Sequence, residues 1–466
     1  MKHVILGAGP AGVIAAETIR KHAPYDTIVL IGDEPEPPYS RMAIPYLLIG
    51  KVGEQGTHLR HDSAHFASLA IQVRRARCTA VDGVRRSLSL NDGSTLLFDT
   101  LLIATGSRPV SPPIPGIDSP DVHPCWTLAD ARAIQAKTHK GTRVLQMGAG
   151  FIGCIIMESL AARGVELTVV EMGDRMVPRM MGPTAGGMIK DWCEKKGVRV
   201  FTGARVESIA SATAGGSEPA ASAGTGGGLL GKIVNLFTGG GAEPAPAHGA
   251  EASRGGLRVK LSTGQTLEAD LIISATGVKP QMEFLQGSGV KCLVGVLTDE
   301  HMQTSVPGIY AAGDCAEAFD KVSGKTIVSA IQPNAADQAY VAAMNMAGKA
   351  ASLKGVTQIN VLDTLGLVST SFGEWQGVPG GEHAELTDRS GQGGGRHLSL
   401  QFKGDVLVGC NSIGWNDHVG VMRGLVEGQI HLGAWKGALL KDPTQLMAAY
   451  LACAQGQDKR ALLKVA

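Results

Sequence analysis

Two short glycine-rich runs have the residue types and spacing in this chain that are most suited to chemistry. The first reads Gly7-Ala8-Gly9-Pro10-Ala11-Gly12, and the second reads Gly148-Ala149-Gly150-Phe151-Ile152-Gly153. Each run follows an apolar stretch that predicts a buried strand and precedes a stretch that predicts a helix. Glycines at this spacing allow a tight turn and a close approach of the backbone to a diphosphate, whose charge the free N–H groups of the helix start favour. The sequence therefore predicts two dinucleotide sites.

Acidic residues follow each run at the distance expected for a ribose contact. In the second copy, Glu171 ends an apolar strand, and a carboxylate there accepts bonds from ribose hydroxyls and repels a 2′-phosphate. Met172 follows it rather than a basic residue, which favours NADH over NADPH, although Arg175 keeps NADPH open. In the first copy, either Asp33 or Glu34 could bind the ribose, and the sequence does not choose between them.

The two runs open the two copies of an internal repeat. Each copy reads strand, glycine turn, helix, strand, hairpin and buried apolar strand, and ends in Ala-Thr-Gly at 104–106 or 275–277. The second copy is longer because of residues 211–256, which are too poor in large apolar side chains to form a core. An apolar island at 229–237 leaves two interpretations open: a flexible insertion with a sticky patch, or a tethered docking peptide for a partner protein.

The predicted fold class is α/β, with two Rossmann-like dinucleotide-binding domains, one inserted in the other, and an α+β C-terminal domain. The predicted domains are 1–112 with 278–350, then 113–277, and a C-terminal interface domain over 351–466. Within this last domain, alternating patterns at 398–402 and 406–410 predict an antiparallel pair, and helices are expected near 417–427 and 443–454.

The composition narrows the class of function. Lys and Arg (43) nearly balance Asp and Glu (42), so the charge of +1 gives no footprint for nucleic acid. No apolar run reaches the roughly 18 residues that a membrane span needs. The eight cysteines are scattered without a Cys-x-x-Cys pair, which predicts no metal site or redox dithiol and favours a reducing, cytoplasmic location.

The repeat, the fingerprints and the segment Thr304–Asp314, which ends Tyr310-Ala311-Ala312-Gly313-Asp314, resemble the FAD/NAD-linked pyridine nucleotide–disulfide oxidoreductase superfamily. The resemblance covers roughly residues 1–350 without the insertion. Its nearest branch holds ferredoxin and rubredoxin reductases, NADH oxidases and the FAD part of NADH-dependent nitrite reductases. It implies that the first fingerprint binds FAD and the second binds NAD(H).

The resemblance also implies roles for individual residues. Asp314 would bond the FAD ribityl chain, Arg41 and Arg108 would contact FAD, and Ile331 with Gln332 would pass close to the flavin ring. Ala80 and Val81 would meet the adenine. The full FAD set is Gly7, Gly9, Pro10, Ala11, Gly12, Asp33, Glu34, Arg41, Ala80, Val81, Ala104, Thr105, Gly106, Arg108, Gly313, Asp314, Ile331 and Gln332. The NAD set is Gly148, Gly150, Phe151, Ile152, Gly153, Glu171 and Gly277.

Departures from the family pattern shape the expected chemistry. Met42 stands where thiol-using relatives carry a cysteine, and a thioether cannot form a thiolate. Tyr46 and Ile155 stand where many relatives carry a lysine and a glutamate, and Glu158, about one turn further on, is expected to face elsewhere. No protein nucleophile is therefore predicted, and the flavin itself must be the reactive centre.

Three functions remain open. The first is an electron-transfer flavoprotein subunit that couples NAD to an iron–sulfur protein or a larger oxidoreductase complex. The second is a self-contained NADH oxidase or reductase of a small acceptor, and the third is a redox sensor without turnover. Trp415, His418 and Trp435 would form a docking face in the first case, or simply pack the core of the C-terminal domain. A homodimer through that domain is also expected from the resemblance.

Overall fold

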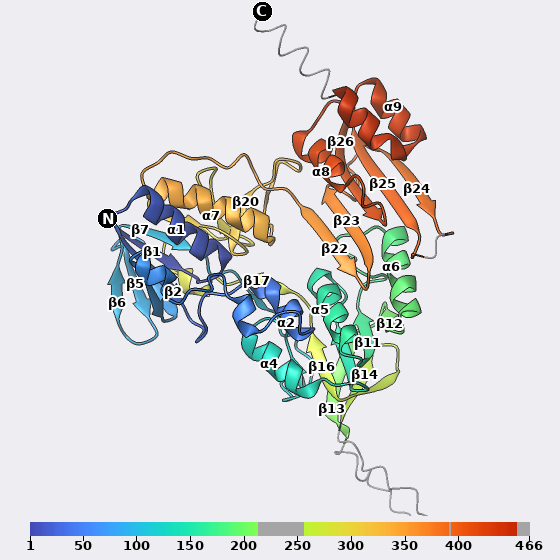
Figure 1. The fold of residues 1–466 in the computed structure, drawn as a ribbon, viewed down its shortest axis with the longest axis horizontal. Coiled ribbons are helices and arrows are strands. Elements are labelled where there is room, and N and C mark those ends of the chain that lie inside the picture. Colours follow the sequence, from blue (N-terminus) through green and yellow to red (C-terminus); the bar gives the residue numbers. More distant parts are fainter. Residues whose placement is uncertain (213–255, 391–392, 454–466) are drawn as a thin grey trace, which may run out of the picture.

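The computed structural model describes residues 1–212, 256–390 and 393–453 (Figure 1). Its first layer is a parallel sheet in the order β19-β7-β1-β2-β3. The strands are β1 (Lys2–Leu6), β2 (Thr27–Gly32), β3 (Ile71–Arg75), β7 (Thr100–Ile103) and β19 (Ile309–Ala311). Helices α1 (Pro10–His22) and α7 (Gln332–Met346) pack side by side on this sheet (Figure 1). Because β19 and α7 come after residue 300, this unit is discontinuous in sequence.

A second parallel sheet lies between the two parts of the first unit in sequence. Its order is β12-β11-β10-β16-β9. The strands are β9 (Val122–His123), β10 (Arg143–Met147), β11 (Glu166–Glu171), β12 (Arg199–Thr202) and β16 (Leu271–Ser274). Helices α4 (Leu128–Lys137), α5 (Phe151–Ala162) and α6 (Pro183–Lys195) supply buried residues to the same core. The two sheets confirm the predicted fold class, in which each glycine run joins a buried strand to a helix.

Each parallel sheet carries a three-stranded antiparallel meander. The first comprises β4 (Cys78–Asp82), β5 (Ser87–Leu90) and β6 (Thr95–Leu97), and the second comprises β13 (Val206–Ser211), β14 (Leu257–Leu261) and β15 (Thr266–Ala269). Gly93 and Gly264 take left-handed conformations in the turns, with φ of 81° and 83°, so both predicted hairpins are confirmed. The apolar island at 229–237 and residues 213–255 around it lie outside the described residues.

Short elements complete the first two units. After each Ala-Thr-Gly segment, β8 (Ser107–Pro109) pairs antiparallel with β17 (Val278–Pro280). The short helices α2 (Ile44–Leu48) and α3 (His65–Ser68) lie in the chain between β2 and β3. A small three-stranded sheet consists of β18 (Val296–Leu297), β20 (Ala316–Phe319) and β21 (Thr326–Ile327). In the described part of the chain, no helix is long and apolar enough to cross a membrane.

The C-terminal part is a five-stranded antiparallel sheet with helices. The order is β22-β23-β26-β25-β24, with β22 (Ile359–Thr364), β23 (Leu367–Gly373), β24 (Glu382–Asp388), β25 (Arg396–Lys403) and β26 (Val406–Ile413). Helices α8 (Val419–Gly428) and α9 (Ala434–Lys441) pack with this sheet around Phe372 and Phe402. Side chains of the sheet, Leu362, Leu367 and Ile413, enter the core of the second unit, where β22 lies against α5.

The C-terminal predictions are confirmed in part. The antiparallel pair is β25 and β26, and the first expected helix is α8. The second expected helix begins with a 3-10 turn at Pro443–Gln445, and residues 446–453 continue as helix. Helix α9 was not predicted, because it has two turns only and buries a single side chain, Leu439, so its periodicity is too weak to detect.

Candidate functional site

The first glycine run shows which of its glycines make room for a ligand. A Cβ on Gly7, whose φ is 111°, would lie 2.0 Å from the Ala104 carbonyl oxygen, and a Cβ on Gly12 would lie 1.9 Å from the Gly7 carbonyl oxygen. A Cβ on Gly9, the residue that precedes α1, would meet no atom of the described residues within 4 Å. The outer glycines therefore allow close packing of the backbone, and the middle one faces open space at the helix start.

The second run repeats this geometry. Gly148 has a φ of 94°, and its Cβ would lie 2.4 Å from the Ala275 carbonyl oxygen, while that of Gly153 would lie 2.6 Å from the Gly148 carbonyl oxygen. Gly150, which precedes α5, again faces space that is free of described protein atoms within 4 Å. Each helix start thus has room for a diphosphate beside its free N–H groups, so two dinucleotides fit the chain.

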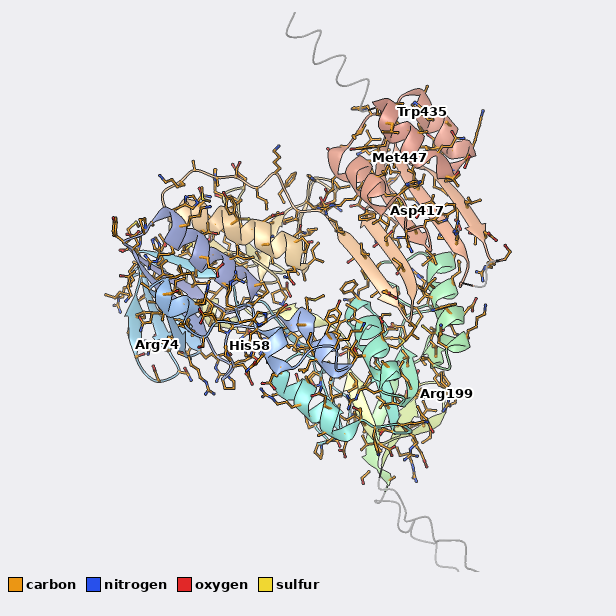
Figure 2. The ribbon with its side chains drawn as sticks, in the orientation of Figure 1. His58, Arg74, Arg199, Asp417, Trp435 and Met447 are labelled. Atoms are coloured by element: carbon orange, nitrogen blue, oxygen red, sulfur yellow. The ribbon has the colours of Figure 1, made fainter. Side chains whose placement is uncertain are left out.

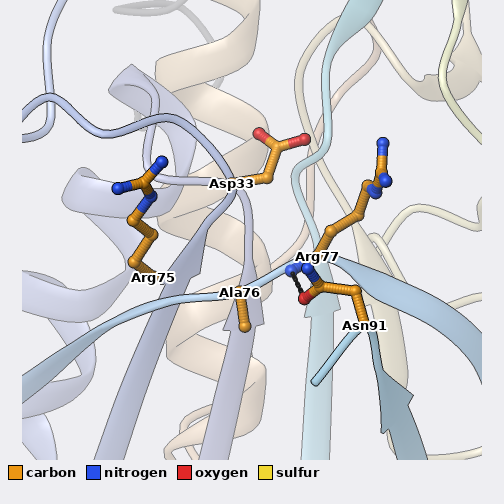
Figure 3. A pocket seen from close by; sticks show the side chains of 5 residues that line it. All are labelled: Asp33, Arg75, Ala76, Arg77 and Asn91. Atoms are coloured by element: carbon orange, nitrogen blue, oxygen red, sulfur yellow. Dashed lines mark hydrogen bonds between the residues drawn. The ribbon is translucent and has the colours of Figure 1, made fainter. Parts of the chain in front are cut away.

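A pocket of about 420 Å³ lies at the end of β2 in the first unit (Figure 3). Figure 3 shows the Asp33 carboxylate between the side chains of Arg75 and Arg77, with Asn91 below them. The Asn91 side-chain oxygen accepts the backbone N–H of Arg77 at 2.8 Å. Sequence reasoning missed Arg75, Ala76, Arg77 and Asn91, although Arg75 ends a parallel strand at the sheet edge where ligands bind.

The two acidic residues that the sequence could not separate have different surroundings. Glu34 accepts the Tyr39 hydroxyl and one Arg41 nitrogen, each at 2.5 Å. Asp33 instead lines the pocket. This geometry favours Asp33 as the ribose-facing carboxylate and leaves Glu34 as the partner of Arg41.

Arg41 is held between two aromatic rings. Its guanidinium carbon lies 5.6 Å from the centre of the Tyr39 ring and 5.4 Å from that of the Trp126 ring, and it donates to the Trp126 carbonyl at 2.8 Å. The Trp126 indole N–H donates to the Ser107 carbonyl at 3.1 Å. Trp126 carries no motif that would have identified it, and it joins the segment before α4 to the loops of the first unit.

Asp314 lies where three elements meet. The Ser107 hydroxyl donates to its carboxylate at 2.9 Å, and burial raises the pKa of the Asp314 carboxyl above its usual range. Gly313, with a φ of 81°, donates its N–H to the Gln338 side chain of α7 at 2.8 Å. A Cβ on Gly313 would lie 3.4 Å from the Cβ of Ala11, in the first turn of α1, and 3.7 Å from the Cβ of Ala335, in the first turn of α7. The starts of α1 and α7 therefore converge beside Asp314, with Ile331 and Gln332 at the start of α7.

The other residues that the resemblance implies for FAD lie outside the group around Asp314 and the pocket at Asp33. Thr105 donates its hydroxyl to the Gln281 carbonyl at 2.7 Å, and Gly106 takes a left-handed conformation. Arg108 forms an exposed ion pair with Glu283. Val81 is buried in the core of the first sheet, Ala80 is exposed on β4, and neither lines the pocket at Asp33.

Glu171 is anchored by the backbone of its own site. It is only 9% exposed, and it accepts the N–H groups of Ala149 and Gly173, each at 2.7 Å. A carboxylate has about four lone-pair positions, so acceptor capacity is left for a ribose.

Arg175 uses its guanidinium inside its own loop. It donates to the carbonyls of Met181 at 2.8 Å and Pro178 at 3.3 Å, and it pairs with Asp174 at 2.7 Å. A 2′-phosphate would have to break these bonds in order to recruit it.

A small apolar hollow of about 20 Å³ lies between the two units. It is lined by Trp126 and by two of the implied NAD residues, Ile152 and Gly277. Its other lining residues are Pro109, Pro124, Cys125, Ile156, Ser274, Ala275 and Val278. Trp126 therefore bonds Ser107 and Arg41 of the first unit and lines the same hollow as Ile152 of α5.

Met42 and Tyr46 lie beside and on α2, and Ile155 lies on α5. Met42 is 49% exposed on a 3-10 turn, and Tyr46 is exposed on α2, which packs on α5 through a bond from the Ser159 hydroxyl to the Pro45 carbonyl at 3.2 Å. Burial and the nearby Asp363 raise the pKa of Glu158.

No cysteine is poised for nucleophilic chemistry. All eight are free, and burial raises the pKa of every one of these thiols, to about 11 in Cys78 and about 12 in Cys125 and Cys193. At neutral pH each is a thiol rather than a thiolate. The described residues also contain no group of three His, Cys, Asp or Glu side chains that could hold a metal ion.

The tryptophans of the C-terminal domain pack against its own core. Trp415 and Trp435 are half-buried there, and the Arg396 guanidinium lies 5.1 Å from the centre of the Trp415 ring. Figure 2 shows Trp435 at helix α9. His418 precedes α8, and one of its ring nitrogens is buried. This arrangement favours core packing over a docking face.

The chain is similar to several known proteins. The family model "Pyridine nucleotide-disulphide oxidoreductase" matches residues 1–259 and 243–344. The chain is 30% identical over 446 residues, or 95% of each chain, to subunit epsilon of the NADH-dependent phenylglyoxylate dehydrogenase of Aromatoleum evansii. It is 28% identical to an NADH oxidase of Methanocaldococcus jannaschii, covering 89% of this chain and 88% of that one.

A solved structure gives the same fold. The NAD-dependent persulfide reductase from A. fulgidus superposes with a TM-score of 0.77 at 25% identity, covering 93% of this chain and 78% of that one. The two fingerprints, their open middle glycines and the family match together give one conclusion: the chain belongs to the pyridine nucleotide–disulphide oxidoreductase family and is an oxidoreductase that uses FAD and NAD(H).

Proposed function

We propose that this chain exchanges electrons, through FAD, between NAD(H) and a one-electron carrier such as an iron–sulfur protein or a subunit of a larger oxidoreductase complex. The observation that carries the proposal is that burial raises the pKa of all eight thiols, so none is poised to relay electrons, and Met42 stands where the resemblance implies a cysteine. When bound, FAD accepts electrons in pairs and releases them singly, which suits this exchange.

The protein residues then bind and orient. Gly9 leaves room for the FAD diphosphate, Asp33 accepts a ribose hydroxyl, and Asp314, oriented by Ser107, accepts from the ribityl chain. Gly150 leaves room for the NADH diphosphate. The remaining residues of the FAD and NAD sets complete these two sites as proposals.

NADH is the proposed coenzyme rather than NADPH. Glu171 is fixed by two N–H groups at the position where a 2′-phosphate would bring negative charge. Arg175, the one residue that kept NADPH open, already spends its donors on Asp174, Pro178 and Met181. The relative from A. evansii, which is named as NADH-dependent, supports the same choice.

The domain division follows from these sites. We propose residues 1–112 with 278–350 as the FAD domain, 113–277 as the NAD domain, and 351–466 as the interface domain. The near full-length match to a dehydrogenase subunit, which includes the C-terminal part, supports a role in a complex. The eight free thiols support a reducing, cytoplasmic location, and a homodimer stays a proposal.

Electron transfer to an iron–sulfur protein is directly testable. The purified protein is mixed anaerobically with NADH and a Rieske-type ferredoxin, whose reduction potential is high enough for NADH to reduce it, and the bleaching of the ferredoxin absorbance is followed. We expect catalytic reduction of the ferredoxin with NADH and at least tenfold slower turnover with oxygen or a disulfide as the acceptor. Faster turnover with oxygen than with any iron–sulfur protein would overturn the proposal.

The second candidate function is an NADH oxidase. It is supported by the relative from M. jannaschii, which is named an NADH oxidase and aligns with 89% of this chain. The same assay separates the two functions. An oxidase consumes NADH and oxygen without any added protein or dye, and it gains nothing from ferredoxin.

A further inference from the structure

The loop after Glu171 is held in a conformation that its own residues oppose. Val177, which is fully buried, has a φ of 49°, and β-branched residues rarely adopt this left-handed conformation. Strain of this kind persists only where neighbouring contacts hold it, and it occurs often at ligand sites.

One end of the loop is bonded to the NAD fingerprint. The Val177 N–H donates to the Ala149 carbonyl at 2.9 Å, and the Ala149 N–H donates to the Glu171 carboxylate at 2.7 Å. The conformation of Val177 therefore bears directly on the residue that fixes Glu171.

The other end of the loop is bonded to the C-terminal sheet. The Asn411 side chain of β26 accepts the Gly182 N–H at 2.8 Å and donates to the Met180 carbonyl at 3.0 Å. Met180 in turn donates its N–H to the Val177 carbonyl at 3.0 Å. Asn411 is 2% exposed, so these bonds are shielded from water.

These contacts form one continuous path from the C-terminal sheet to the coenzyme carboxylate. We propose that Asn411 is a positioning residue of the NADH site: it holds residues 172–182 so that the strained Val177 fixes the fingerprint and Glu171 in their binding geometry. The inference rests on the proposed NADH site. It makes the C-terminal domain a part of coenzyme binding, although that domain carries no cofactor motif.

The test compares Asn411→Ala with the control Asn360→Ala. The Asn360 side chain lies on β22 and bonds Ser371 within the same sheet at 3.2 Å, so it is polar and half-buried but outside the path. NADH dissociation constants, flavin content, melting temperature and kcat with ferricyanide are measured on the full-length holoprotein.

We expect Asn411→Ala to raise the NADH dissociation constant about tenfold, as the loss of one or two buried hydrogen bonds would. Flavin content and kcat at saturating NADH stay within about twofold of the parent, and Asn360→Ala changes the NADH dissociation constant less than about twofold. An unchanged NADH dissociation constant in Asn411→Ala overturns the inference. So does a parallel loss of flavin, melting temperature and kcat, which would indicate a merely structural role.

A rescue variant tests the strain itself. Glycine adopts the left-handed conformation without a steric cost, so Val177→Gly in the Asn411→Ala background is expected to recover most of the NADH affinity. The cavity it leaves lowers the melting temperature but not the affinity. If Asn411→Ala does not fold, Asn411→Asp, which keeps an acceptor for Gly182 and loses the donor to Met180, replaces it with the same expected direction.

Glu171→Ala distinguishes the two levels of the argument. It is expected to raise the NADH dissociation constant about 10- to 100-fold, since a charged acceptor is lost. If it does so while Asn411→Ala does not, the positioning inference alone is wrong. If Glu171→Ala leaves NADH binding unchanged, the proposed coenzyme site is wrong and the inference falls with it.

Discussion

Gly9 is the residue at which ligand binding and folding separate most cleanly. Its backbone is extended, with φ −80° and ψ −173°, and its Cβ direction is open, so Gly9→Ala should change the stability of the apoprotein by less than about 0.5 kcal/mol. The added methyl group fills the space beside the helix start, so FAD binding should be lost.

Flavin content after purification and thermal unfolding of the apoprotein check this prediction. The matched contrast is Gly12→Ala, whose methyl group would meet the Gly7 carbonyl oxygen and damage the fold itself. If a folded Gly9→Ala variant retains FAD, Gly9 does not lie at the FAD site.

Asp314 gives a prediction for pH dependence. Burial raises the pKa of its carboxyl in the native state, so the native state holds the proton more tightly than the unfolded chain does. The free energy of unfolding therefore falls as the pH rises through the native pKa. Apoprotein carrying Asp314→Asn should be more stable than the parent apoprotein at pH 7. This difference should vanish at a pH of about 3, where the Asp314 carboxyl is protonated in both the native and the unfolded state of the parent.

The same substitution should weaken FAD binding, because the charged acceptor for the ribityl chain is lost. Chemical denaturation of both apoproteins at the two pH values, with FAD titrations at pH 7, measures both effects. Equal stabilities at pH 7 would show that the buried carboxyl is not destabilising.

Trp126 and Trp192 form a matched pair. Each donates its indole N–H to a backbone carbonyl at 3.1 Å, and a cationic side chain lies over each ring. The partners of Trp126 are Ser107 and Arg41, which lie near the proposed FAD site, whereas those of Trp192 are Leu365 and Lys196. Trp126→Phe should weaken FAD binding about fivefold, the equivalent of one hydrogen bond of about 1 kcal/mol. Trp192→Phe should leave FAD binding unchanged, and equal effects of the two variants would argue against a role of Trp126 at the FAD site.

At this scale the sequence predicted residue types better than their contacts. The fingerprint glycines follow from local spacing, because a turn and a helix start are local structures. The role of Asp314 was implied only by the resemblance to the family. The choice between Asp33 and Glu34 was not predictable, since it depends on the contacts of Tyr39 and Arg41 with Glu34. Trp126 was missed because its two roles appear only once distant segments meet.

At the scale of elements, Ile413 tests whether the C-terminal sheet shares a core with the second unit. It is fully buried among residues of α5 and β10, so Ile413→Ala should cost about 2–5 kcal/mol of unfolding free energy. Val361→Ala, on the exposed side of β22, should cost less than about 1 kcal/mol. Urea unfolding followed by tryptophan fluorescence measures both, and similar small costs would mean that the two units do not share a core.

Elements were predictable wherever their periodicity was long. The parallel strands and the hairpins around Gly93 and Gly264 are recognisable because apolar runs and turn residues alternate along the chain. Helix α9 was not recognisable, because its two turns bury Leu439 alone. The packing of the C-terminal sheet on α5 and α6 also has no local signal.

At the scale of the whole molecule, the repeat predicted two dinucleotide units but not their dependence on the third. Asn411 reaches Gly182 and Met180 across more than 200 positions of sequence, and such a pairing leaves no trace in spacing or composition. In the sequence, Gly182 and Met180 indicate only a loop after Glu171. We therefore infer that the C-terminal domain helps to hold the proposed coenzyme site.

The central claim is that flavin is the single redox centre between NADH and the acceptor. An anaerobic titration of the purified protein with NADH, followed by flavin absorbance, tests it most directly. Because no thiol takes part, full bleaching should need about one equivalent of NADH per FAD. Uptake of about two equivalents, which would indicate a second two-electron centre such as a reducible thiol pair, would contradict the account.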